Sequence, residues 1–368
     1  MKICCVFNYN PLYRLPIFQA MSERFNCEFY FGDSVFAPLK SFDPADLKGF
    51  RKYLHASRCM RAFVWYSSIG SVLKREYTHY IVTGSHEYLG NWIILFYAKL
   101  FGKKVIGWGH GPKQKETTFK RRFLRKLFFN SLDHVLLYNN NNIKYLEYLG
   151  VERSKISVIH NSLNTPLQTE LYNKIHPSDV YTNHFGNNSP VAIFIGRIQN
   201  RMKVNYLIEA ASILKQRGVN LNVALVGPSI DGENLEELVA ERGLSDCVWF
   251  YGPCYDEHTT SELLYNADVC VAPGTVGLTA IHSLSYGTPC ITHNNPMELG
   301  PEFEAIKEGI TGTFFEENNV ESLANAIQKW INVSDKKAEI RENSRREVLE
   351  NWSIESQMKT IQKMMESL

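Results

Sequence analysis

A turn at residues 274–289, GTVGLTAIHSLSYGTP, follows a short apolar run and leads directly into a helical pattern. Its glycines place no side chains over the first amides of the helix, so an anion can approach the backbone closely. A helix start carries partial positive charge and can hold phosphate without a cationic side chain. The turn has no carboxylate and no lysine, and the next ionisable side chain is His282. We therefore expect phosphate contacts from the amides of Gly277, Leu278 and Thr279, in a binding turn that also contains Gly274, Thr275 and Val276.

Two further loops in the same half of the chain follow apolar, strand-like runs. FIGRIQNRMK places Arg197, Arg201 and Lys203 just after one run, and LVGPSIDG ends another with Gly227 and Ser229. Arginine can engage phosphate oxygens in a bidentate manner, and lysine acts as a point charge. Three such loops at strand ends of one domain predict a binding site for a diphosphate.

Length and composition indicate the number of domains and the class of protein. At 368 residues the chain exceeds the usual size of a single core, so two domains are expected. No apolar run approaches the ~20 residues that a membrane span requires. The start, MKICCVFNYN, reads as a buried strand rather than a signal peptide. The eight cysteines form no C-x-x-C pair, which favours reduced thiols and a cytoplasmic protein.

Charge is distributed unevenly along the chain. Residues 1–175 contain 25 Lys and Arg against 12 Asp and Glu, a difference of +13, whereas residues 176–368 contain 15 against 26, a difference of −11. Much of the excess lies in residues 113–130, KQKETTFKRRFLRKLFFN. Two interpretations stay open: an ordinary helix with a solvated basic face, or a helix that rests on anionic lipid. Nucleic acid is disfavoured as a partner because no recognition module is present.

The helical spacing of residues 113–130 predicts two faces. The expected apolar face consists of Phe119, Phe123, Leu124, Leu127 and Phe128. The expected cationic face consists of Lys120, Arg121, Arg122, Arg125 and Lys126.

Short apolar runs alternate with helical patterns in both halves of the chain, which predicts parallel sheets covered on both faces. A polar stretch without clear periodicity is predicted to connect the two domains, at residues 164–190. We expect an α/β protein of two doubly wound, Rossmann-like domains that face a cleft. The predicted domains are 1–175 and 176–350, with 351–368 as a C-terminal helix that packs back on the N-terminal domain.

Residues 190–315 resemble the donor domain of retaining glycosyltransferases of the GT-B fold, in the group 1 type of family 4. The segments that carry the resemblance are IGRIQNRMKVNYLIEAASIL, NVALVGPS, VWFYGPC, SELLYNADVCVAPG, GLTAIHSLSYGTPCIT and GITGTFF, in the family's order. The first half resembles the matching acceptor domain more loosely, through KKVIGWGHG and KISVIHNSLNT.

The resemblance implies roles for several residues. It places Arg197 on the donor diphosphate together with a nearby lysine, whose position falls on Met202, so that Lys203 is the assigned residue. It places His110 near the reacting sugar, and the residues that follow FYG, Cys254 among them, at the nucleobase.

The chain departs from the family where paired glutamates usually contact the donor sugar and the ribose. Those positions are Gly274 and His282, and a histidine can still hydrogen-bond a ribose hydroxyl. Glu304 aligns with a family glutamate near the ribose or the phosphate loop, and Glu302 could substitute for it.

The loop after the first strand, NYNPLYRLPIF, also departs from the family, which often has a glycine-rich loop there. Tyr13 and Arg14 predict an acceptor pocket in which the arginine pairs with an anionic group, or else a helix cap with packing. His86 ends a strand and is expected either in the cleft, on the acceptor side, or as a structural histidine.

The resemblance implies transfer of a sugar, with retention, from a nucleoside-diphosphate sugar to a saccharide acceptor that we expect to be lipid-linked in the assembly of surface polysaccharide. No cofactor or metal is expected, because there is no D-x-D segment and no cluster with metal-ligand spacing. Two alternatives stay open: a sugar-nucleotide epimerase on the same fold, against which the glutamate-poor loop argues, and a non-catalytic sugar-nucleotide-binding scaffold, which the missing glutamates support.

Overall fold

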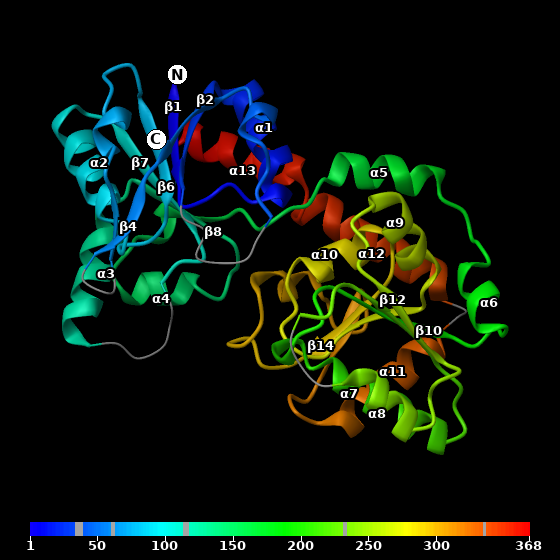
Figure 1. Ribbon diagram of the computed structural model, residues 1–368. Helices are drawn as coiled ribbons and strands as arrows, with labels where there is room; N and C mark the ends of the chain where they lie inside the picture. The colour runs from blue at the N-terminus through cyan, green and yellow to red at the C-terminus, as the bar shows by residue number, and fades with distance from the viewer. Residues whose placement is uncertain (34–39, 60–62, 113–117, 231–233, 334–335) are drawn as a thin grey trace. The chain divides into compact units, whose positions relative to one another are not determined.

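The computed structural model describes residues 1–33, 40–59, 63–112, 118–230, 234–333 and 336–368. The chain forms two compact units (Figure 1). Unit 1 contains Met1–Ser162 together with Ile354–Leu368, and unit 2 contains Leu163–Ser353.

Unit 1 is built on a seven-stranded sheet whose order is β3-β2-β1-β6-β7-β8-β9, with every neighbouring pair parallel. Its strands are β1 (Ile3–Phe7), β2 (Cys27–Gly32), β3 (Phe50–Leu54), β6 (His79–Thr83), β7 (Lys104–Gly109), β8 (His134–Leu137) and β9 (Ile156–Val158). An antiparallel pair stands apart from it, β4 (Ala56–Cys59) with β5 (Phe63–Tyr66). Its helices are α1 (Leu15–Phe25), α2 (Leu89–Leu100), α3 (Phe119–Ser131), α4 (Ile143–Tyr148) and α13 (Ile354–Glu366).

Alternate residues of the central strand β1 enter two different cores. Ile3, Cys5 and Phe7 pack with apolar residues of α1 and α13, whereas Cys4 and Val6 pack with those of α2 and α3. All five residues of β1 are buried, which is expected of a parallel strand covered by helices on both faces. Figure 1 shows α1 and α13 together beside β1 and β2.

Unit 2 is built on a six-stranded parallel sheet with the order β12-β11-β10-β13-β14-β15. Its strands are β10 (Val191–Ile195), β11 (Asn222–Val226), β12 (Val248–Gly252), β13 (Val269–Ala272), β14 (Cys290–His293) and β15 (Gly312–Phe315). Its helices are α5 (Thr165–Lys174), α6 (Val180–Phe185), α7 (Val204–Gln216), α8 (Leu235–Glu241), α9 (Glu257–Asn266), α10 (Leu278–Ser285), α11 (Val320–Ile331) and α12 (Lys337–Asn351). Two short 3-10 helices matter for the site, η5 (Asn200–Met202) and η6 (Pro301–Ala305).

The order of the strands in unit 2 reverses direction beside β10. The chain runs from β10 outward through β11 to β12, and then returns to lay β13, β14 and β15 on the other side. In such sheets ligands bind beyond the carboxyl ends of the strands at the point of reversal. The predicted glycine loops follow β10, β11 and β13, so they meet at this point.

The predicted fold class, two doubly wound parallel α/β domains, is confirmed. The boundary between the units lies after Ser162 rather than at 175, and the stretch read as a connection is helical. The Asn164 side chain accepts a hydrogen bond from the amide of Leu167 and caps α5, and Leu171 and Tyr181 are buried in the core of unit 2. In unit 1, α13 packs against α1 and β9, where the sequence placed the C-terminal helix.

Two further properties concern the cysteines and the helices. All eight cysteines are free thiols. In the described part of the chain no helix has both the length and the hydrophobicity needed to cross a bilayer.

A buried carboxylate joins the first three strands of unit 1. Glu28 on β2 accepts hydrogen bonds from Lys2 at 2.8 Å, from Arg51 at 2.9 Å and from the Tyr77 hydroxyl. Burial alone would raise the pKa of Glu28, but Arg51, Lys2 and Tyr77 together lower it to about 2. A carboxylate whose pKa is lower in the folded than in the unfolded state stabilises the fold above its unfolded pKa, and this contribution is lost as the pH falls.

We therefore expect Glu28→Gln to lower the free energy of unfolding at pH 7 by about 2–3 kcal/mol. The difference from the wild type should shrink as the pH falls from about 5 toward 2, because the wild-type carboxylate then becomes protonated. Glu76→Gln is the matched control, since Glu76 also contacts Lys2 but has a half-exposed side chain. Urea unfolding at several pH values measures both variants, and equal losses for the two would contradict this role of Glu28.

Candidate functional site

The loops after β10 and β11 approach each other through glycine backbones. Gly196 and Gly227 have φ values of 150° and 146°, and a Cβ atom on Gly227 would lie 1.7 Å from the carbonyl oxygen of Gly196. Beyond them the loops are hydrogen-bonded, from the Ile198 amide to the Pro228 carbonyl at 2.9 Å and from the Ile230 amide to the Ile198 carbonyl at 3.0 Å. Only glycine fits at Gly227, so a side chain there would separate the two strand ends.

The start of α10 is held against the same strand ends. The Thr279 hydroxyl donates to the carbonyl of Ile195, the last residue of β10, at 3.1 Å. The Gly274 amide donates to the Met202 carbonyl at 2.9 Å, and the Thr275 hydroxyl donates to the Glu298 carbonyl at 3.1 Å. The first turn of α10, the site predicted for phosphate, is therefore fixed in place beside Gly196.

Gly274, where the resemblance implies the loss of a glutamate, has no room for a side chain in this structure. A Cβ atom on Gly274 would lie 2.2 Å from the Arg201 carbonyl oxygen and 2.6 Å from the Met202 carbonyl carbon. These are backbone atoms of η5, which cannot move aside as a side chain can. The backbone of η5 thus fills the space that a side chain at position 274 would need.

A cavity of about 300 Å³ opens at these strand ends, which is within the range of small-molecule sites. Six of the predicted residues line it: Arg197, Gly227, Cys254, Leu278, Thr279 and His282. The other lining residues are Leu163, Ile195, Gly196, Val226, Pro228, Tyr255, Glu257 and Thr260. The predicted residues of unit 2 outside this lining are Arg201, Lys203, Ser229, Gly274, Thr275, Val276, Gly277 and Glu304.

Lys203 does not join Arg197 at the cavity. Its ammonium group donates to Asn318 at 2.6 Å and lies 3.7 Å from the Glu317 carboxylate, both in the loop before α11. Its backbone is left-handed, with a φ of 49°, a conformation that favours glycine. Arg201, in η5, is exposed to solvent. Of the three cations predicted around the diphosphate, the structure brings Arg197 to the cavity.

Glu257, in the first turn of α9, is a cavity residue that sequence reasoning missed. Its Oε1 accepts hydrogen bonds from His282 Nε2 at 3.1 Å, from the Tyr286 hydroxyl at 2.7 Å and from Gln168 Nε2 at 3.1 Å. Burial alone would raise the pKa of Glu257, but His282, Tyr286 and Gln168 lower it to about 2. In the sequence it stands among polar residues after an N-capping aspartate, like any acidic residue at a helix start.

A second carboxylate lies beside the glycine turn. Glu302 in η6 is only 3% exposed, and its Oε2 lies 3.9 Å from the position of a Cβ atom on Gly277. Glu304, the residue favoured from the sequence, is half-buried, and its carbonyl accepts from the Lys307 ammonium at 2.6 Å. The turn that contains no carboxylate in its own sequence therefore receives one from η6.

In unit 1, Tyr138 links two of the predicted residues. Arg14 donates a hydrogen bond to the Tyr138 hydroxyl, and its guanidinium lies 5.5 Å from the Tyr13 ring centre. The exposed His110 ring lies edge-on to the Tyr138 ring, with 4.8 Å between their centres. Tyr138 directly follows β8, and nothing in its sequence context indicated this position. The structure thus brings Tyr13, Arg14 and His110 together around one tyrosine.

His86 lies elsewhere in unit 1 and is 7% exposed. Burial lowers the pKa of His86 to about 4, with further lowering from Arg125 and Arg121. His86 is therefore neutral near pH 7, as is common for a buried histidine.

Helix α3 has its faces arranged differently from the prediction. Arg125, expected on the cationic face, is buried with Phe128 and Phe129, whereas Phe119 and Phe123, expected on the apolar face, are 73% and 56% exposed. The helix places Phe128 and Phe129 near its end in the core, whereas its first residues are exposed. Residues 113–117 of the predicted segment lie outside the described part of the chain.

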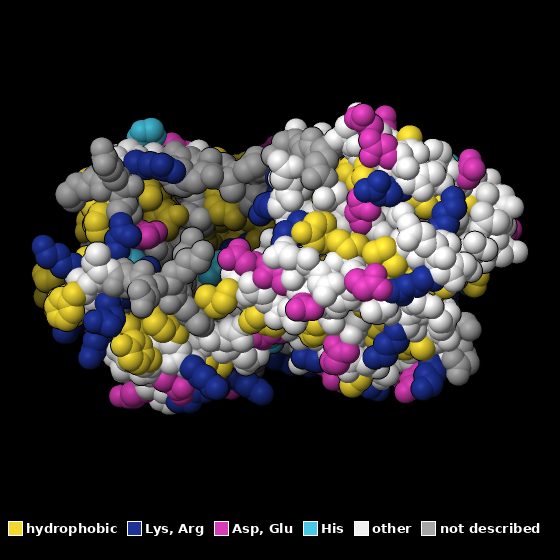
Figure 2. Space-filling model, turned by 90° about the horizontal axis from the view of Figure 1, so that it is seen from below, with side chains coloured by type: hydrophobic (Ala, Val, Ile, Leu, Met, Phe, Trp, Pro, Cys, Tyr) yellow, Lys and Arg dark blue, Asp and Glu magenta, His cyan; other side chains and the backbone are white. Residues whose placement is uncertain are grey.

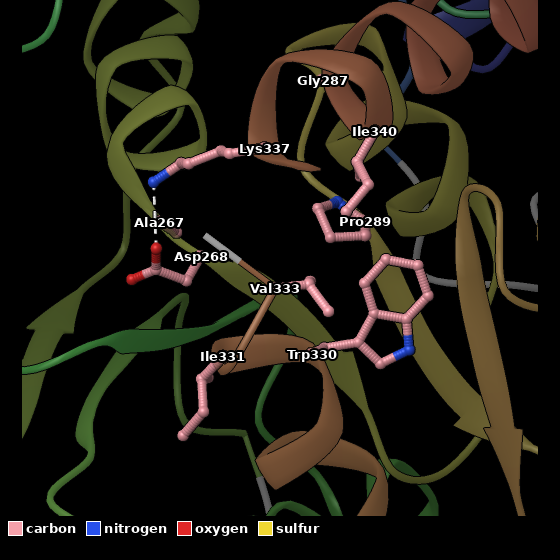
Figure 3. Close-up of a pocket in the computed structure, with 9 residues that line it drawn as sticks. All are labelled: Ala267, Asp268, Gly287, Pro289, Trp330, Ile331, Val333, Lys337 and Ile340. Carbon is pink, nitrogen blue, oxygen red and sulfur yellow. Dashed lines mark hydrogen bonds and ion pairs between the residues drawn. The ribbon is translucent and has the colours of Figure 1, made fainter. Parts of the chain in front are cut away.

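Two further hollows in unit 2 lie away from the carboxyl ends of the strands. One, of about 280 Å³, lies over α11 and α12 and contains none of the predicted residues. Another, shown in Figure 3, lies before β13 and β14 and has a volume of only about 20 Å³. There Lys337 points toward Asp268, at 2.9 Å, while Trp330 and Pro289 lie across from them. The cavity at the glycine loops is therefore the best candidate for the site.

Part of the chain is similar in sequence to known proteins. Residues 182–347 match the model of the family described as Glycosyl transferases group 1. The chain is 24% identical to the alpha-D-kanosaminyltransferase of Streptomyces kanamyceticus over 42% of its length and 40% of that protein. It is 32% identical to the D-inositol 3-phosphate glycosyltransferase of Nocardia farcinica over 38% of its length and 32% of that protein. The matched region thus spans well under half of these relatives.

Solved structures match the chain over its whole length. The Anabaena protein HepE in complex with UDP has a TM-score of 0.75 at 16% identity, and the alignment covers 100% of both chains. A glycosyltransferase from Rickettsia africae has a TM-score of 0.74 at 17% identity, with 99% and 98% coverage. The chain therefore has the two-domain GT-B fold of glycosyltransferases. Within it, residues 182–347 of unit 2 match the model of the glycosyl transferases group 1 family.

Gly274→Ala should destabilise the protein by more than about 3 kcal/mol, because the new methyl group would overlap backbone atoms that cannot yield. Gly70→Ala is the control, since a Cβ atom there would meet nothing within 4 Å, and it should change stability by no more than about 1 kcal/mol. Thermal unfolding measures both. A Gly274→Ala protein as stable as the wild type would show that the space beside η5 is not closed.

Proposed function

We propose that the protein transfers a sugar from a nucleoside-diphosphate sugar to a saccharide acceptor, with retention of anomeric configuration. The observation that carries this proposal is the cavity of unit 2, which combines a guanidinium, a helix start and an ionised carboxylate at the reversal point of the sheet. The HepE structures in complex with UDP and with UDP-glucose support a donor of this class.

The cavity is suited to hold the charge of a leaving nucleoside diphosphate. Arg197 and the first residues of α10, Leu278 and Thr279, line it together. As the bond to the sugar breaks, negative charge grows on the diphosphate, and preorganised donors stabilise that charge without reorganising. The main-chain amides at the start of α10 and Arg197 supply these donors in this proposal. Lys203, held by Glu317 and Asn318, would have to leave those partners to contribute.

Unit 1 supplies the acceptor side in this proposal. His110 is the exposed, ionisable member of the group around Tyr138, and we assign to it the positioning of groups near the anomeric carbon. Arg14, fixed by Tyr138, is suited to hold an anionic group such as the phosphate of a lipid-linked acceptor.

The proposed reaction uses neither a cofactor nor a metal ion. Among the described residues no group of three or more His, Cys, Asp and Glu side chains is placed to hold a metal. Charge neutralisation is assigned instead to Arg197 and the start of α10.

Arg197→Ala should lower kcat/KM for sugar transfer by about a hundredfold or more, because a preorganised cation at the departing charge is lost. The fold should remain intact, which circular dichroism can verify. Arg242→Ala is the control: Arg242 pairs with Glu209 on the surface at 2.7 Å and is absent from the cavity lining. Product analysis with a panel of sugar nucleotides and acceptors measures both variants.

Full activity of Arg197→Ala would refute the diphosphate assignment. Binding of a sugar nucleotide without turnover on any acceptor would instead favour a second function, a non-catalytic sugar-nucleotide-binding scaffold. The closed space at Gly274 favours that alternative, because it excludes the carboxylate that relatives usually place near the donor sugar.

A lipid-linked acceptor would place the enzyme at a membrane, and α3 has the surface for it. Phe119, Phe123 and Leu127, spaced one helical turn apart, are 73%, 56% and 46% exposed. Exposed Lys120, Arg121, Arg122 and Lys126 lie on the same helix. Figure 2 shows hydrophobic side chains beside Lys and Arg on the surface of unit 1. Apolar side chains that enter the headgroup region, flanked by cations, are typical of helices that bind anionic bilayers. We propose that α3 rests on an anionic bilayer.

Replacing Phe119, Phe123 and Leu127 together by serine should reduce co-sedimentation with phosphatidylglycerol vesicles by about tenfold or more, since the apolar contribution to binding is lost. The wild type should bind phosphatidylcholine vesicles far more weakly, because neutral lipid offers no charge to the basic residues. Ile310→Ser with Leu349→Ser removes two exposed apolar side chains of unit 2 and serves as the control. Equal sedimentation of the wild type, the triple variant and the control would refute the proposal that α3 binds the bilayer.

A further inference from the structure

The two carboxylate oxygens of Glu257 have different surroundings. Oε1 receives all three hydrogen bonds, from His282, Tyr286 and Gln168. Among the described residues Oε2 has no hydrogen-bond donor, although Glu257 lines the cavity and its side chain is 30% exposed. The three donors hold the carboxylate in one orientation and leave one oxygen available to a ligand.

The chemistry of that oxygen restricts what can bind there. A carboxylate whose pKa is about 2 is ionised at neutral pH and can only accept hydrogen bonds. It repels phosphate, so the diphosphate must lie toward Arg197 and the start of α10. The ligand group beside Oε2 must then be a neutral donor, either a hydroxyl or an N–H.

The spacing along α10 selects between the parts of a nucleotide. Thr279 lies in the first turn, and His282, which donates to Glu257, lies one turn further along the helix, a rise of about 5 Å. In a nucleoside diphosphate the ribose, with hydroxyls on C2′ and C3′, lies between the diphosphate on C5′ and the base on C1′. The group that reaches Glu257 when the diphosphate is at the helix start is therefore the ribose.

On the basis of the proposed function, we propose that Oε2 of Glu257 accepts a hydrogen bond from a ribose hydroxyl of the donor, so that the site selects ribonucleotides over deoxyribonucleotides. The carboxylate is provided by α9, because position 282 of α10 carries a histidine. His282, Tyr286 and Gln168 act as positioning residues that hold Glu257.

Isothermal titration calorimetry on the full chain tests this inference with UDP, GDP and their 2′-deoxy and 3′-deoxy forms. For whichever of UDP and GDP binds, removing the ribose hydroxyl that contacts Glu257 should weaken binding by about tenfold to a hundredfold. This is the usual effect of losing a hydrogen bond to a charged group. Glu257→Gln places an amide where the carboxylate was. It should weaken the ribonucleotide by a similar factor and bring the ribo and deoxy forms to within about twofold of each other.

Glu241→Gln, on the exposed face of α8, is the matched control and should keep the wild-type preference. Equal wild-type affinity for ribo and deoxy forms would overturn the inference and leave the proposed function standing. A second result would also overturn the inference and leave the proposed function standing: GDP and both of its deoxy forms bind equally well, and UDP does not bind. That result would place a base beside Glu257. Failure of every nucleotide to bind would overturn both. If Glu257→Gln does not fold, the wild-type comparison decides the inference alone.

Discussion

Close contact between backbones is the constraint on which the rest of unit 2 depends. Gly227 meets the carbonyl of Gly196, and Gly274 meets the carbonyls of η5, at distances that leave no room for a Cβ atom. These contacts bring the ends of β10, β11 and β13 together and fix the start of α10 beside β10. The first residues of α10, Leu278 and Thr279, line the cavity together with Arg197. The same closeness removes a carboxylate from position 274, so the charges of the site must come from other elements.

Only some of those charges could be found from the sequence pattern. Arg197 could be found, because it directly follows a strand and a glycine at the reversal point of the sheet. Glu302 was named only as a substitute for Glu304, and Glu257 was missed, since a carboxylate at the start of a helix is usually solvated. Their roles depend on which donors the fold brings to them: Gln168 lies 89 residues before Glu257 and Tyr286 lies 29 residues after it. The pairing of Lys203 with Glu317 and Asn318 is long-range in the same way.

The fold itself could be predicted from the sequence, because apolar runs that alternate with helical patterns indicate parallel sheets. The errors arose where burial is decided by tertiary context. Residues 164–190 looked like a connection because they are polar, yet Leu171 and Tyr181 suffice to bury α5 and α6. The faces of α3 were assigned from helical spacing, but Arg125 is buried and Phe119 is exposed. Periodicity predicts which side chains share a face of a helix, but the neighbouring elements decide which face is buried.

The discontinuity of unit 1 has a consequence for the order in which the chain acquires structure during synthesis. Ile354, Met358, Ile361 and Met364 of α13 complete the core that α1 begins, so this core stays open until residues 354–368 have left the ribosome. Unit 2, in contrast, is a single continuous segment and can close beforehand. Nascent unit 1 must therefore keep an apolar face exposed while nearly two hundred residues of unit 2 are added, from Leu163 to Ser353. The sheet of the N-terminal unit is thus translated first, and the core on one face of it is completed last.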